Sequence, residues 1–273
     1  MLVESGVAQT RAAAGRLARP LGFVPTMGAL HEGHLALISA ARSECAAVAV
    51  SVYVNPLQFE AGEDFERYPR DLDGDRSRLE RAGVDLFFAP AADAMAQPGY
   101  STFVDVGALG ASYEGRRRPS HFRGVATVVA KLLAIMRPNV LYLGQKDAQQ
   151  TAVVRRMIAD LQFDVGVRIV PTAREDDGLA LSSRNAYLSP EDRRAAPTLY
   201  AMLERARDLM SSGVAKTTAI GQARAVLSDR ASLDYVDVVD ADSFTPSELR
   251  PPCFVIAAAS FGQTRLLDNL WIR

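Results

Sequence analysis

Short apolar runs alternate with amphipathic segments through residue 170 of the chain. Each run is followed by a segment whose apolar residues recur with helical spacing. The nearly continuous apolar character of the runs indicates strands that are buried on both faces, as in a parallel sheet covered by helices. The pattern predicts strands at 21–24, 46–54, 84–89, 101–106, 139–143 and 165–170, and helices at 34–45, 71–82, 125–137 and 148–161.

The remainder of the chain follows a different pattern. Helices are predicted at 191–211 and 217–229, followed by short strands at 235–239, 254–258 and 264–268. The strand–helix alternation of the first part predicts a doubly wound, Rossmann-like parallel α/β domain. We therefore expect an α/β domain over 1–172 and a smaller α+β domain over 173–273.

Composition narrows the class of protein. A chain of 273 residues that is 48% hydrophobic can bury a large core. Its net charge of −1 favours neither nucleic acid nor an anionic membrane as a partner. No run is apolar for long enough to span a bilayer, and the first 19 residues lack the apolar region of a signal peptide. Cys45 and Cys253 have no metal-ligand spacing, so we expect a reduced, cytoplasmic protein.

The stretch Pro25–His34, which reads Pro-Thr-Met-Gly-Ala-Leu-His-Glu-Gly-His, joins the first predicted strand to the first predicted helix. Gly28 and Gly33 permit a positive φ or a close approach of the backbone to a ligand. His31 and His34 are three residues apart, so they share the face of the helix start to which free N–H groups and the positive dipole end point. Such a turn suits a phosphate and the charge that grows during nucleotidyl transfer. A plain strand-to-helix connection is the alternative.

Three further polar segments are candidates for binding. Asn55–Phe59 follows a strand, and ligands of open α/β sheets bind at the carboxyl ends of strands; a plain turn is the alternative. Gly144–Asp147 repeats the strand–glycine–helix arrangement, and its Lys146 suits a polyphosphate, although an exposed lysine fits equally well. Ser182–Asn185 offers hydroxyls and a guanidinium, as in a phosphate site or a linker.

Arg116, Arg117 and Arg118 form a basic cluster before Pro119. Such a cluster is typical of a solvated loop, and steering of an anionic substrate is the alternative. The chain has no Gly-x-Gly-x-x-Gly after its first strand and no P-loop motif. A nucleotide would therefore be held by the histidine turn.

Taken together, six ordered motifs resemble those of the pantothenate synthetase family, ligases that join pantoate to β-alanine with ATP. They lie at 25–34, 55–59, 68–70, 121–131, 144–150 and 178–185, and the segment 262–269 also fits. The resemblance implies a nucleotidyltransferase-type domain with a C-terminal lid domain. It implies that (R)-pantoate and β-alanine are condensed through a pantoyl adenylate, with release of AMP and pyrophosphate, in pantothenate and coenzyme A biosynthesis. It also implies a homodimer that requires Mg²⁺.

The resemblance assigns roles to single residues. The expected catalytic residues are His34, His31, Lys146 and Arg184. The residues expected to contact ATP are Met27, Gly28, Ala29, Leu30, His31, Glu32, Gly33, His34, Gly144, Gln145, Lys146, Asp147, Ala173, Leu181, Ser182, Ser183 and Arg184. Those expected to contact pantoate or β-alanine are Gln58, Gln150, Asn55, Tyr68 and His121. Asp75 falls in the region expected to hold the metal, although Mg²⁺ often binds mainly through substrate phosphates.

Two residues depart from the family pattern. Gln145 stands where Glu is more usual, which removes a charge beside Lys146 and could alter the affinity for ATP. Ser120 stands where Gly is more usual before His121. Neither change removes a group to which chemistry is assigned.

The implied reaction agrees with these side chains. Adenylation gives a carboxylate a good leaving group, and His31, His34 and Lys146 are donors suited to the negative charge that builds on the phosphate oxygens. Gln58 and Gln150 can hold pantoate without a tight salt bridge to its carboxylate. A nucleotidyltransferase that moves AMP onto a phosphorylated acceptor is one alternative, but it would need a basic acceptor pocket. A non-catalytic nucleotide-binding protein is another, which the presence of both histidines, Lys146 and Arg184 argues against.

Overall fold

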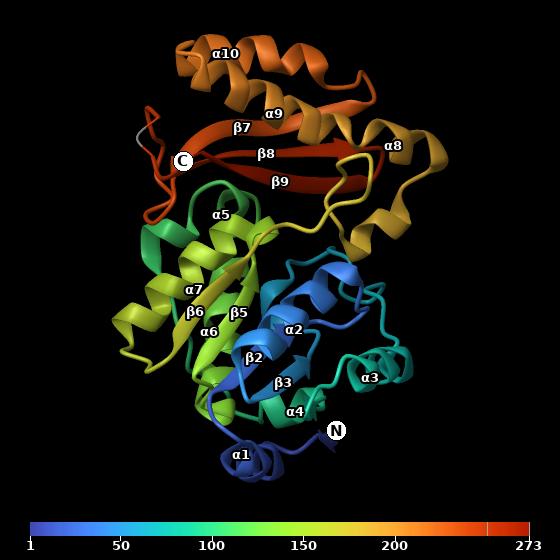
Figure 1. The fold of residues 1–273 in the computed structure, drawn as a ribbon, viewed down its shortest axis with the longest axis vertical. Helices are drawn as coiled ribbons and strands as arrows, with labels where there is room; N and C mark the ends of the chain where they lie inside the picture. Colours follow the sequence, from blue (N-terminus) through green and yellow to red (C-terminus); the bar gives the residue numbers. More distant parts are fainter. Residues whose placement is uncertain (250, 273) are drawn as a thin grey trace. The chain divides into compact units, whose positions relative to one another are not determined.

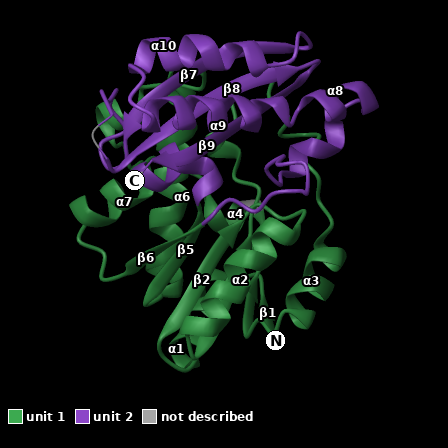
Figure 2. Cartoon of the chain, turned by 45° about the horizontal axis from the view of Figure 1, so that its top comes forward, with its two compact units in different colours: residues 1–144, 153–170 green, residues 145–152, 171–273 purple. Residues whose placement is uncertain are grey.

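The structure is a computed structural model of the chain, and it describes residues 1–249 and 251–272. Two compact units divide the chain: residues 1–144 and 153–170 form the first, and residues 145–152 and 171–273 form the second (Figure 2). The predicted lid role of the C-terminal part stays a prediction. Within the described residues, no helix has the length and apolar character needed to cross a membrane.

A six-stranded parallel sheet forms the centre of the first unit (Figure 1). Its spatial order is β1-β4-β3-β2-β5-β6, and every neighbouring pair is parallel. The chain runs outward from β2 through β3 to β4 and then continues on the other side of β2 with β5 and β6. This order confirms the predicted doubly wound class and places a topological switch point between β2 and β5. The strands are β1 (Leu2–Glu4), β2 (Leu21–Thr26), β3 (Ala47–Val52), β4 (Leu86–Phe88), β5 (Val140–Gly144) and β6 (Gly166–Val170).

Helices cover both faces of this sheet, as the continuous apolar runs predict. Successive strand residues enter opposite cores: Phe23 packs in one hydrophobic cluster and Val24 in the other. The cluster around Phe23 includes residues of α1 (Val7–Arg16), α6 (His121–Met136) and α7 (Ala148–Asp160). The cluster around Val24 includes residues of α2 (Glu32–Glu44) and α3 (Leu72–Arg81).

Strand β2 pairs unequally with its two neighbours. Its ladder with β3 runs through six residue pairs, to Thr26 opposite Val52. Its ladder with β5 has two pairs and ends at Phe23 opposite Leu141. Pro25 lies beyond that point and has no N–H group to donate. The carboxyl end of β2 therefore remains hydrogen-bonded on one side only.

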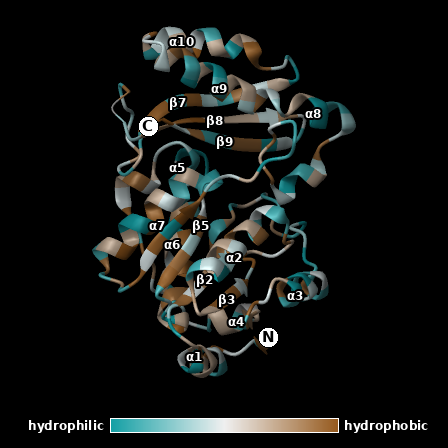
Figure 3. Ribbon diagram, in the orientation of Figure 1, coloured by the Kyte–Doolittle hydropathy of each residue, from teal (hydrophilic) through white to brown (hydrophobic). Residues whose placement is uncertain are grey.

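The second unit contains a three-stranded antiparallel sheet in the order β7 (Ala231–Asp240), β8 (Cys253–Phe261) and β9 (Thr264–Ile272). Its helices are α8 (Pro190–Ala195), α9 (Thr198–Ser211) and α10 (Lys216–Ala223). Met202 of α9 and Ala257 of β8 belong to one buried cluster. Brown, hydrophobic colouring follows β5 of the first unit and β8 of this one, in agreement with their burial (Figure 3).

Several predicted elements differ from the structure. The strand at 101–106 is wrong: this segment is irregular, and the N–H of Val104 bonds to the Thr127 hydroxyl instead of a neighbouring strand. Its apolar alternation arises because Val104 and Val106 pack against the core. The single helix at 191–211 is two helices, separated at Pro197, and the helix at 217–229 ends at Ala223. β1, α1, α4 (Ala92–Met95) and α5 (Glu114–Arg117) were not predicted, and the last two are single turns.

Candidate active site

The two histidines of the turn after β2 cap helix α2 reciprocally. His31 is the N-cap residue, and its Nδ1 accepts the N–H of Gly33 at 3.2 Å. The Nδ1 of His34 accepts the N–H of His31 at 3.3 Å, and the two rings lie 4.1 Å apart between centroids. Two backbone N–H groups that a helix start would leave unsatisfied are thereby bonded.

This capping determines what the imidazoles can offer a ligand. A nitrogen that accepts a hydrogen bond from an N–H carries no proton, so the proton of each neutral ring is assigned to Nε2. Both rings are therefore assigned as Nε2–H donors, and they lie at the amino end of a helix, where the macrodipole favours negative charge. The arrangement suits an anionic oxygen, as the sequence predicts.

The side chain of Asp75, in α3, accepts hydrogen bonds from the main chain of the histidine turn. Its Oδ1 accepts the N–H of Leu30 at 2.7 Å, its Oδ2 accepts the N–H of Ala29 at 2.9 Å, and the residue is 2% exposed. Burial raises the pKa of the Asp75 carboxyl above its ordinary value, and the two N–H groups counteract that shift. Gly28 has a φ of +88°, and a Cβ there would lie 2.9 Å from Oδ2 of Asp75 and 2.8 Å from Val52. The backbone therefore approaches this carboxylate more closely than a side chain would allow.

The sequence places Asp75 in the metal region, whereas the structure gives it a positioning role toward the histidine turn. The described residues contain no group of three or more His, Cys, Asp or Glu side chains arranged to hold a metal. Metal ligation by Asp75 stays a prediction.

Asn55 and Gln58, two residues expected at the pantoate site, are held together in the short 3₁₀ helix η1 (Pro56–Gln58) and its N-cap. Asn55 is 1% exposed, and its Nδ2 donates to the carbonyl of Gly124 and to Oε1 of Gln58, both at 3.1 Å. Since the Gly124 carbonyl only accepts, the orientation of the Asn55 amide is determined. The Gln58 amide then directs its Nε2 to the sulfur of Met27, 3.1 Å away.

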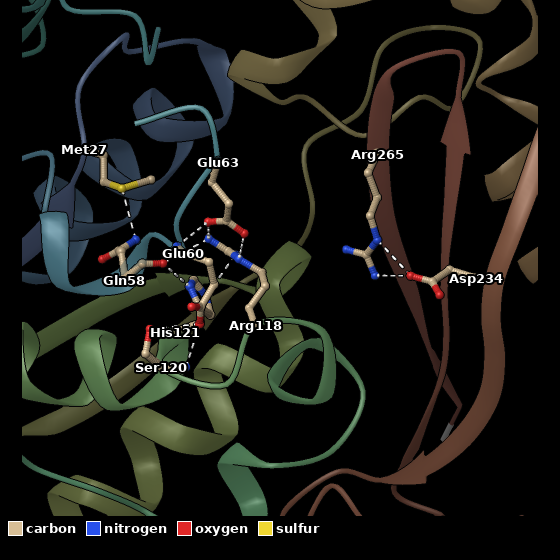
Figure 4. Close-up of polar contacts among 9 residues, drawn as sticks. All are labelled: Met27, Gln58, Glu60, Glu63, Arg118, Ser120, His121, Asp234 and Arg265. Atoms are coloured by element: carbon tan, nitrogen blue, oxygen red, sulfur yellow. Dashed lines mark hydrogen bonds and ion pairs between the residues drawn. The ribbon is translucent and has the colours of Figure 1, made fainter. Parts of the chain in front are cut away.

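The backbone of Gln58 is held by His121, the first residue of α6, and by Arg118, which precedes that helix (Figure 4). Its carbonyl accepts a hydrogen bond from Nδ1 of His121 at 2.9 Å and another from Nη2 of Arg118 at 3.0 Å. Nε2 of His121 lies 3.4 Å from Nη1 of Arg118. Burial and the Arg118 charge lower the pKa of His121 to about 4, so the ring is neutral, donates from Nδ1 and accepts at Nε2. The structure thus uses His121 to orient Gln58.

Tyr68 is 6% exposed, and its ring contacts Phe59 edge-on with centroids 6.0 Å apart. Phe59 in turn contacts Phe65 at 5.3 Å. The expected pantoate-binding residue is therefore part of an aromatic cluster that supports the loop after η1.

The second unit carries the expected lysine turn, η3 (Gln145–Asp147), directly after Gly144. Nδ2 of Asn269, a buried residue of β9, donates to the carbonyls of Gln145 and Lys146, both at 2.9 Å. The Oδ1 of Asn269 accepts from Nε2 of Gln145 at 3.1 Å. The neutral amide that departs from the family pattern thus has a matching partner, and Lys146 lies 3.4 Å from Oδ1 of Asp147.

The remaining expected residues of this unit lie on one loop and one helix. The carbonyl of Ala173 accepts the N–H of Leu181 at 2.9 Å, which closes the loop between them. Ser182 caps the 3₁₀ helix η4 (Ser183–Tyr187), in which its hydroxyl accepts the N–H of Arg184 at 3.3 Å. Gln150 lies half-buried on α7.

Sequence reasoning missed the roles of three residues. Arg118 was treated only as part of a basic cluster, and Asn269 only as part of a matching segment, because their partners lie far away in the chain. The third is Ser120: its N–H and its hydroxyl donate to Oε1 of Glu60 at 2.7 and 2.8 Å, and they hold the pKa of Glu60 below its ordinary value. A glycine at this position would supply only the first of these bonds.

Comparisons with known proteins agree over the whole chain. The family model described as pantoate-beta-alanine ligase matches residues 3–271. The chain is 52% identical over 259 residues to the pantothenate synthetase of Heliobacterium modesticaldum, covering 93% of this chain and 92% of that one. It is 50% identical over 274 residues to the pantothenate synthetase of Thermus thermophilus, covering 99% of both.

Solved structures give the same result. A crystal structure of pantothenate synthetase from Thermus thermophilus matches with a TM-score of 0.95 and 49% identity, covering 99% of both chains. The pantoate-beta-alanine ligase of Francisella tularensis, crystallised with beta-gamma ATP and β-alanine, matches with a TM-score of 0.81 and 33% identity, covering 99% of this chain and 97% of that one.

Proposed function

Because the chain belongs to the pantoate–β-alanine ligase family, we propose that it uses ATP to activate (R)-pantoate as a pantoyl adenylate and then transfers the pantoyl group to β-alanine. The observation that carries this proposal is the reciprocal cap of His31 and His34. It places two imidazole rings with Nε2–H assigned as donors at the amino end of a helix that begins after β2, at the switch point of a parallel sheet.

In the first step, a carboxylate oxygen of pantoate attacks the α-phosphorus of ATP, and the bond from that phosphorus to the bridging oxygen of pyrophosphate breaks. Negative charge grows on the α-phosphate oxygens and on the departing pyrophosphate. His31, His34, Lys146 and Arg184 are the proposed donors to this charge. The remaining contacts to ATP are proposed for Met27–Gly33, Gly144–Asp147, Ala173 and Leu181–Ser183.

Pantoate is proposed to bind at Gln58 and Gln150, with Asn55, Tyr68 and His121 supporting its site. Asn55 occupies the carbonyl oxygen of the Gln58 amide, and one N–H of its NH₂ group is directed at the Met27 sulfur, so the second N–H is the donor that suits a carboxylate or hydroxyl oxygen of pantoate. A neutral donor orients the carboxylate without a salt bridge that would reduce its nucleophilicity.

In the second step, the amine nitrogen of β-alanine attacks the acyl carbon of the adenylate, and the bond from that carbon to the AMP oxygen breaks. The nitrogen loses a proton as the amide forms. This step needs no nucleophilic side chain, so positioning by the residues above supplies most of the catalysis.

Mg²⁺, a cytoplasmic location and a homodimer complete the proposal, and each rests on family resemblance. The described residues form no carboxylate or histidine cluster for a metal. Mg²⁺ often binds mainly through substrate phosphates, and we propose that the ATP phosphates hold it here, where it would neutralise their charge. Light scattering tests the dimer: a monomer at micromolar concentration would contradict it.

A pyrophosphate exchange assay tests the function directly. We expect the protein to incorporate labelled pyrophosphate into ATP when pantoate is present, without any need for β-alanine. Addition of β-alanine should then yield pantothenate and AMP in equal amounts. Formation of ADP, or exchange that does not depend on pantoate, would show that the proposed adenylation is wrong.

A further inference from the structure

Arg118 differs from the two arginines that precede it. Arg116 and Arg117 are exposed, whereas 14% of the Arg118 side chain is exposed. Its Nε and Nη2 bond to the two carboxylate oxygens of Glu63 at 2.6 and 2.8 Å (Figure 4). This two-pronged geometry fixes both the position and the plane of the guanidinium.

The guanidinium that Glu63 fixes also holds the backbone of Gln58. Its Nη2 donates to the Gln58 carbonyl at 3.0 Å, beside the bond that His121 donates to the same oxygen. The main chain of α6 at Gly124 lies close to the main chain before Gln58. A Cβ on Gly124 would be only 2.2 Å from the carbonyl oxygen of Leu57. Rotation of the peptide after Gln58 would break both bonds to its carbonyl.

We propose that Arg118, fixed by Glu63, is a positioning residue that orients Gln58 toward pantoate. Asn55 holds the side-chain amide of Gln58 and Arg118 holds its carbonyl, so the direction in which Gln58 donates is set at both ends of the residue. This inference rests on the proposed function, in which Gln58 binds pantoate.

The same geometry argues against steering by Arg118. Its charge is paired with the Glu63 carboxylate, and four of its five N–H donors face Glu63, Gln58 and His121. A steering residue acts through an unpaired charge and loses its effect at high salt. Arg116 keeps an exposed side chain two residues away, so it serves as a matched control.

The test compares Arg118→Met with Arg116→Met by steady-state kinetics, with pantoate and ATP varied separately. Loss of a hydrogen bond from a charged donor predicts that Arg118→Met raises the KM for pantoate about 10- to 100-fold. The KM for ATP should stay close to that of the parent. Arg118→Lys keeps a positively charged donor nitrogen but loses the planar guanidinium, and it should recover part of the pantoate affinity. Arg116→Met should change neither constant.

Glu63→Gln tests the same ion pair by changing the carboxylate partner of Arg118. If Arg118→Met does not fold, Glu63→Gln decides whether the ion pair positions Gln58. It keeps an oxygen acceptor but loses the charge and the two-pronged geometry, so a smaller rise in the KM for pantoate is expected. The double variant should be no worse than Arg118→Met alone, because both changes act through one contact.

The results can contradict this inference in three ways. Equal effects of Arg116→Met and Arg118→Met that disappear at high salt would establish steering. A lower melting temperature with a parental KM for pantoate would establish a purely structural contact.

Gln58→Ala separates the two proposals: if it raises this KM and neither Arg118→Met nor Glu63→Gln does, the inference fails while the proposed function stands. If Gln58→Ala leaves the KM unchanged, the proposed role of Gln58 fails as well.

Discussion

The Nδ1 atom of His34 accepts the main-chain N–H of His31 at 3.3 Å, so a residue expected to be catalytic also completes the helix cap of its neighbour. The two roles use different nitrogens of one ring. Nδ1 stabilises the start of α2, and Nε2–H is the donor that we propose acts on a phosphate oxygen. A substitution that removes one function and keeps the other can therefore separate them.

We predict that His34→Asn folds with a melting temperature close to that of the parent but adenylates pantoate about 10² to 10³ times more slowly. Asn can place its side-chain oxygen near the position of Nδ1, whereas it has no group at the position of Nε2. Loss of one donor to growing charge typically has an effect of this size. Single-turnover formation of pyrophosphate, measured beside a melting curve, checks both statements.

His34→Ala is the companion variant, since it loses both nitrogens. It should be as slow as His34→Asn and also less stable, by about 1 kcal/mol for the lost cap. If His34→Ala melts early but adenylates at the parental rate per folded molecule, His34 is structural and the catalytic donor lies elsewhere.

Asp75→Asn should disturb the histidine turn without changing the response to Mg²⁺. One carboxylate oxygen becomes an NH₂ group that faces a main-chain N–H of Ala29 or Leu30, which destabilises the protein by about 1–3 kcal/mol. At saturating Mg²⁺ we expect a lower kcat and a higher KM for ATP. Asp73→Asn, an exposed change in the first turn of the same helix, is the control. A defect in Asp75→Asn that excess Mg²⁺ reverses would instead support the metal role expected from the sequence.

Gly28→Ala tests whether close approach of the backbone shapes the turn. Gly62 has nearly the same φ, +86° against +88°, but nothing lies within 4 Å of a Cβ placed there. Gly62→Ala should therefore cost only about 1–2 kcal/mol, the penalty for a side chain in the left-handed region. Gly28→Ala should cost clearly more and also slow adenylation, because its Cβ meets Val52 and Asp75. Chemical denaturation of both variants measures the difference, and equal losses would contradict the crowding argument.

The stability of the protein should fall as the pH drops from about 6.5 to about 4. Over this range the unfolded chain protonates His121, whose ordinary pKa is 6.5, while the folded protein, with a His121 pKa of about 4, does not. This difference in protonation lowers the free energy of unfolding by roughly 3 kcal/mol between pH 6.5 and pH 4. His121→Gln has no ring to protonate, so its free energy of unfolding should decline less between pH 7 and 4.5. Parallel declines in the two proteins would show that His121 does not carry this dependence.

The alternation of apolar runs was enough to predict the parallel sheet, because a strand buried on both faces must be apolar at nearly every position. The same reasoning failed at 101–106. Val104 and Val106 pack against the core there, but the N–H of Val104 bonds to the Thr127 hydroxyl and not to a neighbouring strand. A pattern of burial reports which side chains are covered, and it does not report which backbone groups are paired.

The local geometry of the candidate site was predictable where it depends on neighbours in the chain, and unpredictable where it depends on distant contacts. His31 and His34 share one turn, so their common face follows from helix geometry. The bonds from Ala29 and Leu30 to Asp75 join residues about 45 positions apart, and the local spacing of residues does not predict them. The family resemblance named a role for Asp75 but could not say what its oxygens touch.

The carbonyl oxygen of Leu21 accepts the N–H of Asn139, just before β5, whereas that of Thr26 accepts the N–H of Tyr53, just after β3. Main-chain groups of successive residues along a strand point to opposite neighbours, so Pro25 shares the side of Leu21, and the N–H that it lacks is one that would have pointed to β5. The sheet is therefore a four-stranded and a two-stranded ladder joined along a short seam. Strand-to-strand hydrogen bonds therefore fix the two ladders against each other only near the amino end of β2 and leave the positions of their carboxyl ends to side-chain packing.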